Sequence, residues 1–241
     1  TIPTRLPPGW PVRGSRQFPK PGASPVVSRV RLRVTEIFFS LQGEGRTVGW
    51  PTAFVRLTGC PLRCGYCDTT YAFKGGKWTT VPQILDAVAA HSPRYVTVTG
   101  GEPLAQRDCP ELLKALCDAG YEVSLETSGA LDICGLDDRV VRVMDLKTPA
   151  SGESEQNRWQ NLDCLDERDQ VKFVICDRGD YDWARAVVAE HHLESRCEVL
   201  FSPAYETQNP VSLAEWILQD GLNVRFQLQL HKVLWGEERA R

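Results

Sequence analysis

Three cysteines lie within one short segment of the chain, at Cys60, Cys64 and Cys67, with the spacing C-x₃-C-x₂-C. Thiolates are the ligands by which proteins hold iron–sulfur clusters. Three of them can bind only three irons of a 4Fe–4S cube, so the fourth iron stays open to a group that is not protein. The spacing therefore predicts a cluster with one open coordination site, and that site is where chemistry would take place.

Zinc is the alternative metal for this loop. Structural zinc sites usually take four ligands, commonly as two separated pairs. The sequence has no second Cys or His pair at a suitable spacing, since His191 and His192 are adjacent. An iron–sulfur cluster is therefore favoured over zinc.

The other six cysteines of the chain have no tight spacing. The total of nine is odd, and the chain is longer than the small scaffolds that disulfides hold together. A reduced thiol among apolar neighbours acts as a small hydrophobic side chain. We expect packing or incidental roles, in a reducing cytoplasm, for Cys109, Cys117, Cys134, Cys164, Cys176 and Cys197.

Strand-like and helix-like segments alternate after residue 30. Strands are predicted at Val34–Phe39, Thr52–Leu57, Tyr95–Thr99, Glu122–Glu126, Val140–Leu146, Val171–Cys176, Glu198–Phe201 and Val224–Leu230. Helices are predicted at Val81–Ala90, Cys109–Ala119, Tyr181–Glu190 and Ser212–Asp220, the last capped by Ser212 and ended by Gly221. The polar stretch 148–168 fits neither pattern.

This β–α alternation predicts a parallel sheet covered by helices. About six βα units are too few for a closed eight-stranded barrel, so a partial, open barrel or a doubly wound sheet fits. Polar segments follow the predicted strands at Cys60, 99–102, 126–128 and 145–147. Active sites of barrel-like α/β proteins lie at the carboxyl ends of the strands. We therefore expect these segments to form one site.

Composition limits the class of protein. The chain has 241 residues, enough for one domain with a sizeable core, and its net charge of −3 argues against bulk binding to nucleic acid. No apolar run approaches the roughly 18 residues that span a bilayer, and the start of the chain shows no secretion signal. Residues 1–30 are rich in proline and are expected to form a loosely wrapped or disordered extension, which leaves 31–241 as the catalytic domain.

The cysteine loop, with Tyr66 before its last cysteine, resembles the cluster loop of the radical S-adenosylmethionine (SAM) superfamily. The resemblance implies that the methionine part of SAM binds the open iron and that one electron from the cluster cleaves SAM to a 5′-deoxyadenosyl radical. It places Tyr66 beside the adenine. The segment T-G-G-E-P at 99–103 resembles the superfamily's SAM-binding segment, which would bring Glu102 to the amino group of methionine.

Further motifs resemble a narrower family, the 7-carboxy-7-deazaguanine synthases, over roughly residues 31–235. They are L-Q-G-E-G at 41–45, Arg56, C-D-T at 67–69, E-T-S-G at 126–129, D-L-K at 145–147 and H-K at 231–232. The resemblance implies a carbon–nitrogen lyase that converts 6-carboxy-5,6,7,8-tetrahydropterin to 7-carboxy-7-deazaguanine with loss of ammonia, in the route to queuosine, a tRNA modification.

The resemblance also implies roles for individual residues, with no side chain acting as the catalyst because the radical forms on SAM. Cys60, Cys64 and Cys67 would hold the cluster and Thr69 would bind Mg²⁺. SAM would contact Tyr66, Cys67, Asp68, Gly101, Glu102, Glu126, Ser128, Asp145, Leu146 and Lys147. The substrate would contact Leu41, Gln42, Gly43, Arg56, Thr99 and His231, with Arg56 on the carboxylate because its planar group binds carboxylates with two hydrogen bonds.

Two alternatives remain open on the residues alone. An activating enzyme for a glycyl-radical protein shares the small size and the cysteine spacing but would need no substrate residues such as 41–45 and Arg56. A non-catalytic iron–sulfur electron-transfer module would need no SAM-binding segment. For the favoured enzyme we expect a flavodoxin-like or other reductant, a homodimer and a cytoplasmic location.

Overall fold

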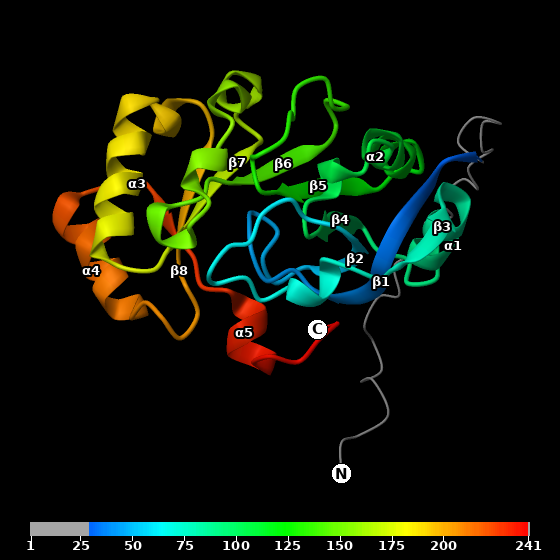
Figure 1. The fold of residues 1–241 in the computed structure, drawn as a ribbon, viewed down its shortest axis with the longest axis horizontal. Coiled ribbons are helices and arrows are strands. Elements are labelled where there is room, and N and C mark those ends of the chain that lie inside the picture. The colour runs from blue at the N-terminus through cyan, green and yellow to red at the C-terminus, as the bar shows by residue number, and fades with distance from the viewer. Residues whose placement is uncertain (1–28, 241) are drawn as a thin grey trace, which may run out of the picture.

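The computed structural model describes residues 29–240, whose strands form one curved sheet (Figure 1). Residues 1–28, most of the predicted N-terminal extension, lie outside the described range. The nine strands have the order β3-β1-β2-β4-β5-β6-β7-β8-β9. They are β1 (Arg31–Leu41), β2 (Pro51–Leu57), β3 (Lys77–Thr80), β4 (Tyr95–Gly100), β5 (Glu122–Thr127), β6 (Val141–Asp145), β7 (Gln170–Ile175), β8 (Glu198–Pro203) and β9 (Arg225–Phe226).

Seven of these strands run parallel to one another: β2, β4, β5, β6, β7, β8 and β9. At one edge the antiparallel strands β1 and β3 extend the sheet, and β3 was not predicted. The edge strands β3 and β9 do not pair with each other, so the described sheet stays open. This confirms the predicted partial barrel, with one more parallel strand than the six expected.

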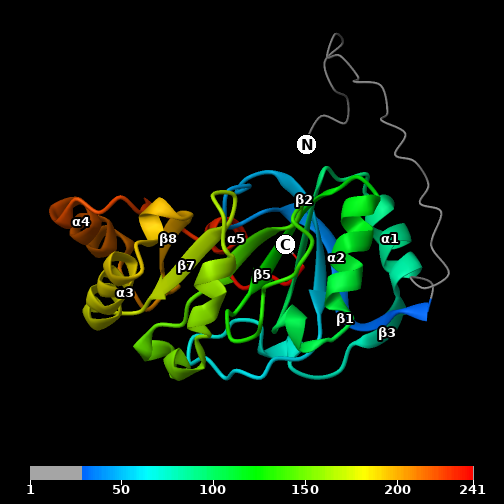
Figure 2. The same ribbon diagram turned by 90° about the horizontal axis from the view of Figure 1, so that it is seen from above.

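Four helices flank the sheet on its outer side (Figure 2). Helices α1 (Val81–Ala89) and α2 (Cys109–Asp118) lie at the end near β1, and α3 (Arg178–Glu190) and α4 (Pro210–Asp220) lie at the end near β8. No helix among residues 29–240 is long and apolar enough to cross a membrane.

Two of the helix starts show how local sequence sets these boundaries. Thr80 accepts a hydrogen bond from the backbone of Gln83, whose side chain accepts one from Thr80 in return, a capping box that begins α1. Helix α4 begins at Pro210 and not at the predicted Ser212, because the side chain of Asn209 accepts from the backbone N–H of Val211 and Ser212. A proline directly after an asparagine is a favourable first helical residue.

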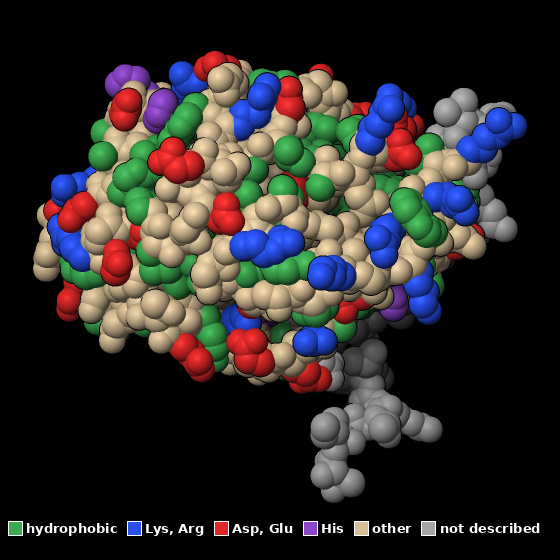
Figure 3. Space-filling view, viewed as in Figure 1, with side chains coloured by type: hydrophobic (Ala, Val, Ile, Leu, Met, Phe, Trp, Pro, Cys, Tyr) green, Lys and Arg blue, Asp and Glu red, His purple; other side chains and the backbone are tan. Residues whose placement is uncertain are grey.

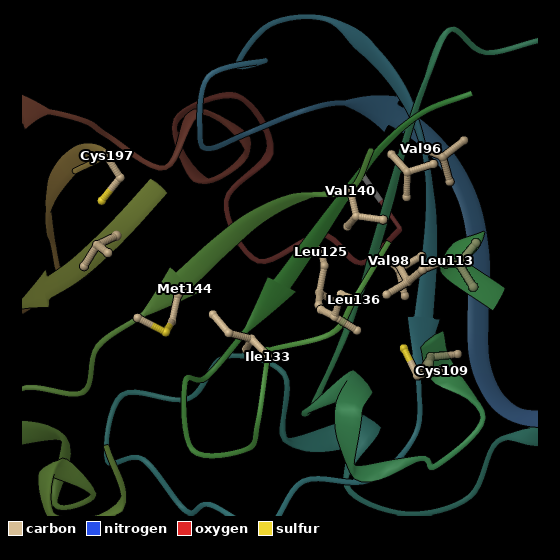
Figure 4. Packing of buried hydrophobic residues seen from close by; sticks show 14 of the residues in the cluster. Val96, Val98, Cys109, Leu113, Leu125, Ile133, Leu136, Val140, Met144 and Cys197 are labelled. Atoms are coloured by element: carbon tan, nitrogen blue, oxygen red, sulfur yellow. The ribbon is translucent and has the colours of Figure 1, made fainter. Parts of the chain in front are cut away.

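The core lies between the sheet and the helices. Figure 4 shows the side chains of Val96, Val98 and Leu125 among those of Leu113 and Leu136. Each of these side chains is buried. Full burial of such a side chain stabilises the fold by about 1.5–3 kcal/mol, so the outer face of the parallel strands is the main packing surface. The opposite, inner face is free to carry polar groups.

The C-terminal part of the chain differs from the prediction of a last strand over Val224–Leu230. Strand β9 holds only Arg225 and Phe226, and residues Leu230–Trp235 form helix α5. The chain leaves the sheet because its next partner is elsewhere: the backbone N–H of Leu230 donates to the carbonyl of Gly43 at 3.0 Å. Helix α5 thereby lies beside the loop after β1.

The unassigned stretch 148–168 forms three short 3₁₀ helices, at Pro149–Ser151, Ser154–Gln156 and Trp159–Cys164. The last of them ends at Cys164, which forms a disulfide with Cys134, so the prediction of incidental, reduced thiols is wrong for these two. Asn161 brings the segments together by donating to the carbonyls of Gly129 and Leu131. A separation of 30 residues gave no sequence signal for this pairing. The other four are free thiols at buried or half-buried positions: Cys109, Cys117, Cys176 and Cys197.

Candidate functional site

A cavity of about 520 Å³ lies at the carboxyl ends of the parallel strands. It is lined by most of the predicted site residues: Leu41, Gln42, Gly43, Arg56, Cys60, Cys64, Tyr66, Cys67, Asp68, Thr69, Thr99, Gly101, Glu126, Ser128, Asp145, Lys147 and His231. Glu102 and Leu146 are fully buried and do not line it. Basic and acidic side chains are interspersed on the face of the molecule shown in Figure 3.

The cysteine loop follows β2 and is held in place by its backbone. Gly59 donates to the carbonyl of Ala72 at 2.8 Å, and Gly65 donates to that of Ser151 at 3.0 Å. The thiols of Cys60, Cys64 and Cys67 are free and half-buried, and all three line the cavity. Burial raises the pKa of Cys60 and Cys64, and the positive charge of Lys147 acts in the opposite direction on both.

This loop does not have the geometry of a site for a single metal ion. Among residues 29–240, no three His, Cys, Asp or Glu side chains converge on one point. Thiolates that each bind a different iron need not converge, because the cluster itself spans the distance between them. The donor set of three free thiols that line one cavity therefore fits a cluster.

Gly100, the last residue of β4, is required by packing against Leu57 in β2, and Gly101, which follows it, by packing against the cysteine loop. A Cβ added to Gly101 would lie within 3.0 Å of the Gly59 carbonyl oxygen and of Cys60 Cβ. The backbone N–H of Glu102 donates to the same carbonyl of Gly59 at 2.8 Å. The G-G pair thus lets the end of β4 contact the backbone that carries the cluster cysteines.

Replacing Gly101 with alanine is expected to destabilise the protein by about 1–3 kcal/mol, because the backbone it meets cannot move aside as a flexible side chain could. The shifted loop should also retain less iron after cluster reconstitution. Gly65→Ala is the matched control, since its Cβ would meet nothing closer than 3.7 Å. Urea unfolding and iron content per chain test both variants, and equal values for the two would contradict this account.

The carboxylate of Glu102 is held by hydrogen bonds from two strand ends. Its carboxylate accepts from Thr127 Oγ1 at 2.9 Å and from the backbone and hydroxyl of Ser128 at 2.6 and 2.5 Å. It also accepts from the backbone N–H of Leu104 at 2.9 Å. The side chain therefore ties the end of β4 to the end of β5, beneath the cavity.

The inner face of β4 and β5 is polar, because Thr97 and Thr99 alternate with the buried valines of β4. Thr99 Oγ1 donates to Glu126 Oε2 at 2.8 Å, and Gln42 Nε2 donates to Thr97 Oγ1 at 2.9 Å. Burial, together with the negative charge of nearby Glu44, raises the pKa of Glu126. These side chains form a fixed array of hydrogen-bonding groups on the cavity wall.

Two predicted substrate residues far apart in sequence, Gly43 and His231, are in direct contact. A Cβ on Gly43 would lie within 3.0 Å of the His231 imidazole. Gly43 has no special backbone angle, unlike Gly45 and Gly49 in the same loop, whose φ values are +72° and +83°. Gly43 is therefore needed because it leaves room for the histidine of α5.

Several charged or polar residues that line the cavity received no role from the sequence, among them Glu44, Lys172, Gln229 and Lys232. Lys172 forms ion pairs with Glu44 and, at 3.3 Å, with Asp145. Burial alone would raise the pKa of Glu44, but Lys172 and Gln229 lower it to about 2. The signal was present, since Lys172 is a charged residue inside an otherwise apolar strand.

Tyr66 and Thr69 lie on the cysteine loop as the sequence suggested. The hydroxyl of Tyr66 is buried and has no hydrogen-bond partner among the described residues, and Lys147 Nζ lies 5.7 Å from its ring. An unpartnered buried hydroxyl next to a cavity fits a bound group that supplies the partner. Thr69 Oγ1 donates to Asp68 Oδ1 at 2.8 Å, and Lys232 lies 3.3 Å from the same carboxylate, at Oδ2.

Comparisons with known proteins agree with this geometry. Residues 54–146 match the family model of the radical SAM superfamily. The chain is 44% identical to the 7-carboxy-7-deazaguanine synthase of Chlorobaculum tepidum, over 86% of this chain and 96% of the relative, and 42% identical to that of Koribacter versatilis, over 86% and 98%.

Among solved structures, the crystal structure of QueE from Escherichia coli has the same fold. The match has a TM-score of 0.70 at 23% identity and covers 83% of this chain and 95% of that one. The fold, the cysteine loop and the relatives that match over nearly their whole length agree. The chain belongs to the 7-carboxy-7-deazaguanine synthase family of radical SAM proteins.

Proposed function

We propose that this protein is a 7-carboxy-7-deazaguanine synthase, a carbon–nitrogen lyase that converts 6-carboxy-5,6,7,8-tetrahydropterin to 7-carboxy-7-deazaguanine with release of ammonia. One observation carries the proposal: the three thiols and the polar wall of Gln42, Arg56 and His231 line the same cavity. Its volume of about 520 Å³ suits a small molecule. An activating enzyme for a glycyl-radical protein would need a surface that receives a protein loop. A cavity that suits a small molecule therefore favours the lyase.

A 4Fe–4S cluster and SAM are the cofactors of the radical SAM family. Cys60, Cys64 and Cys67 would hold the cluster, which supplies the electron for radical formation on SAM. Lys147 and Asp145 form an ion pair at 3.1 Å on the same wall and offer one charge of each sign. Such a pair suits the oppositely charged groups of methionine. Gly101 and Ser128 would contact SAM through the strand ends, and Leu146 only through its backbone.

The substrate would lie between the loop 41–45 and the inner face of β4 and β5. Gln42 and Glu126 offer an amide and a carboxyl group that match the amino and carbonyl edge of a pterin ring, and Thr99 fixes the Glu126 carboxyl. Arg56 would bind the substrate carboxylate. His231 in α5 closes the opposite side against Gly43.

We assign Mg²⁺ to Thr69. Magnesium usually takes one or two protein oxygens and completes its coordination with water and substrate. The hydroxyl proton of Thr69 points to Asp68, which leaves the oxygen lone pairs for a cation. Lys232 holds the Asp68 carboxylate on its other side and thereby orients the pair.

A reductant must deliver the electron, and we propose a flavodoxin-like protein, a homodimeric enzyme and a cytoplasmic location. The structure pairs Cys134 with Cys164 as a disulfide, a bond that is rare in a reducing cytoplasm. Neither cysteine lines the cavity. The redox state of this pair is therefore separate from the chemistry of the site.

The test is an anaerobic assay with reconstituted cluster, reductant, SAM, Mg²⁺ and 6-carboxytetrahydropterin, followed by detection of 7-carboxy-7-deazaguanine. Arg56→Ala is expected to raise the KM for the substrate by about 10- to 100-fold, since a charged hydrogen bond is lost, and to leave the cluster absorbance unchanged. Arg46→Ala is the control, because Arg46 pairs with Glu198 outside the cavity. Absence of product from the unaltered protein, with SAM cleavage only when a protein partner is added, would show that the proposed function is wrong.

A further inference from the structure

We propose that Glu36 and Tyr71 are positioning residues that aim Arg56 at the carboxylate of the substrate, an inference that rests on the proposed function. Neither side chain lines the cavity, whereas Arg56 does. Both lie behind the arginine and contact it from different elements. They form a support that makes Arg56 selective for a carboxylate.

The first contact is set by strand register. Glu36 in β1 is the direct cross-strand partner of Arg56 in β2, and the register shifts between Val34 and Glu36. Directly opposed residues of an antiparallel pair have their side chains on the same face of the sheet. Arg56 Nε donates to Glu36 Oε1 at 2.7 Å, and both side chains are largely buried, at 16% and 21% exposure.

The second contact comes from the segment after the cysteine loop. Tyr71 lies in the 3₁₀ helix Thr70–Ala72, and its hydroxyl donates to the same Glu36 oxygen at 2.9 Å. The Arg56 guanidinium lies 5.8 Å from the Tyr71 ring and 5.6 Å from the Phe38 ring.

These contacts leave a defined part of the guanidinium free. Among the described residues, the hydrogen bonds of Arg56 use Nε alone. Because Glu36 occupies the Nε edge, a ligand carboxylate is left with the end formed by the two Nη groups, where it can accept two parallel hydrogen bonds. Glu36 therefore selects which edge of Arg56 the substrate meets.

Without this support Arg56 would be free to turn toward another carboxylate on the cavity wall. Glu126 lines the same cavity and accepts from Thr99, the residue of β4 that pairs with Arg56 in register. A guanidinium released from Glu36 would turn toward this second carboxylate. Its two Nη groups would then no longer face the carboxylate of the substrate, so the loss falls on ligands that carry this carboxylate.

The experiment compares Glu36→Ala, Glu36→Gln and Tyr71→Phe with the unaltered enzyme. Glu36→Ala should raise the KM for 6-carboxytetrahydropterin by about 10- to 100-fold with little change in kcat, because the lost contact is a hydrogen bond between charged groups. Glu36→Gln keeps an acceptor oxygen without the charge and should raise the KM by about threefold to tenfold. Tyr71→Phe should have a similarly small effect. Glu122→Ala, which removes an exposed partner of Arg94, is the matched control.

A second readout separates positioning from a merely structural role. Inhibition by a tetrahydropterin without the 6-carboxylate should be unchanged in Glu36→Ala. Adding Glu36→Ala to Arg56→Ala should not raise the KM for 6-carboxytetrahydropterin any further. Equal weakening for both pterins, or a full additional loss in the double variant, would overturn the proposal. If the unaltered enzyme makes no deazaguanine, the proposed function has failed instead, independently of these variants.

Discussion

Replacing Cys64 with alanine is expected to abolish turnover while leaving the apoprotein folded. Two thiolates and an empty third position do not hold a 4Fe–4S cluster firmly, so iron content and the cluster absorbance should fall together with activity. The loop itself is fixed by backbone hydrogen bonds at Gly59 and Gly65, which the substitution does not touch. Urea unfolding of the apoprotein should therefore change by no more than about 0.5 kcal/mol, as for an ordinary surface substitution.

Cys117→Ala is the control for this experiment. Cys117 is a free, buried thiol on α2 that does not line the cavity. This variant should keep its cluster and its turnover after reconstitution. A Cys64→Ala protein with full iron content and unchanged absorbance would contradict the assignment of this loop as the cluster site.

Lys172→Met should be the most destabilising substitution in the cavity. Lys172 is a buried cation between the carboxylates of Glu44 and Asp145. Removing one partner of a buried ion pair costs about 3–5 kcal/mol, and here it leaves Glu44 without its cation, while Asp145 keeps Lys147 at 3.1 Å. Urea unfolding of the apoprotein at pH 7 measures the loss. Lys114→Met removes an exposed pair with Asp118 and should cost no more than about 1 kcal/mol.

The pH dependence of this loss identifies its cause. In the unaltered protein the folded-state pKa of Glu44 is about 2, below its ordinary value of 4.5, so its contribution to stability is present above pH 4.5 and is lost as the pH falls toward 2. Without Lys172 only His231 and Gln229 oppose the effect of burial, so the folded-state pKa of Glu44 should rise. The difference between variant and unaltered protein should therefore shrink as the pH falls. A constant difference would point to packing instead of charge.

Much of the fold could be predicted because its signals are local. Alternating strand and helix patterns gave the parallel sheet and the order of its elements, since each pattern depends on residues a few positions apart. The predicted start of α4 was wrong because Asn209, and not Ser212, caps the helix. The strand predicted at 224–230 was wrong because the backbone N–H of Leu230 donates to the carbonyl of Gly43.

The sequence by itself determined the chemistry, because three cysteines within a segment of eight residues must share one loop and strand-end motifs must share one edge of a parallel sheet. Tertiary structure alone decided how the neighbours are used. It buried Glu102 under the site, placed His231 against Gly43, and set Glu36 behind Arg56. Those relations depend on strand register and on segments up to 188 residues apart, since 231 − 43 = 188. No local pattern encodes them, because they are fixed only when the sheet has curved and α5 has packed against it.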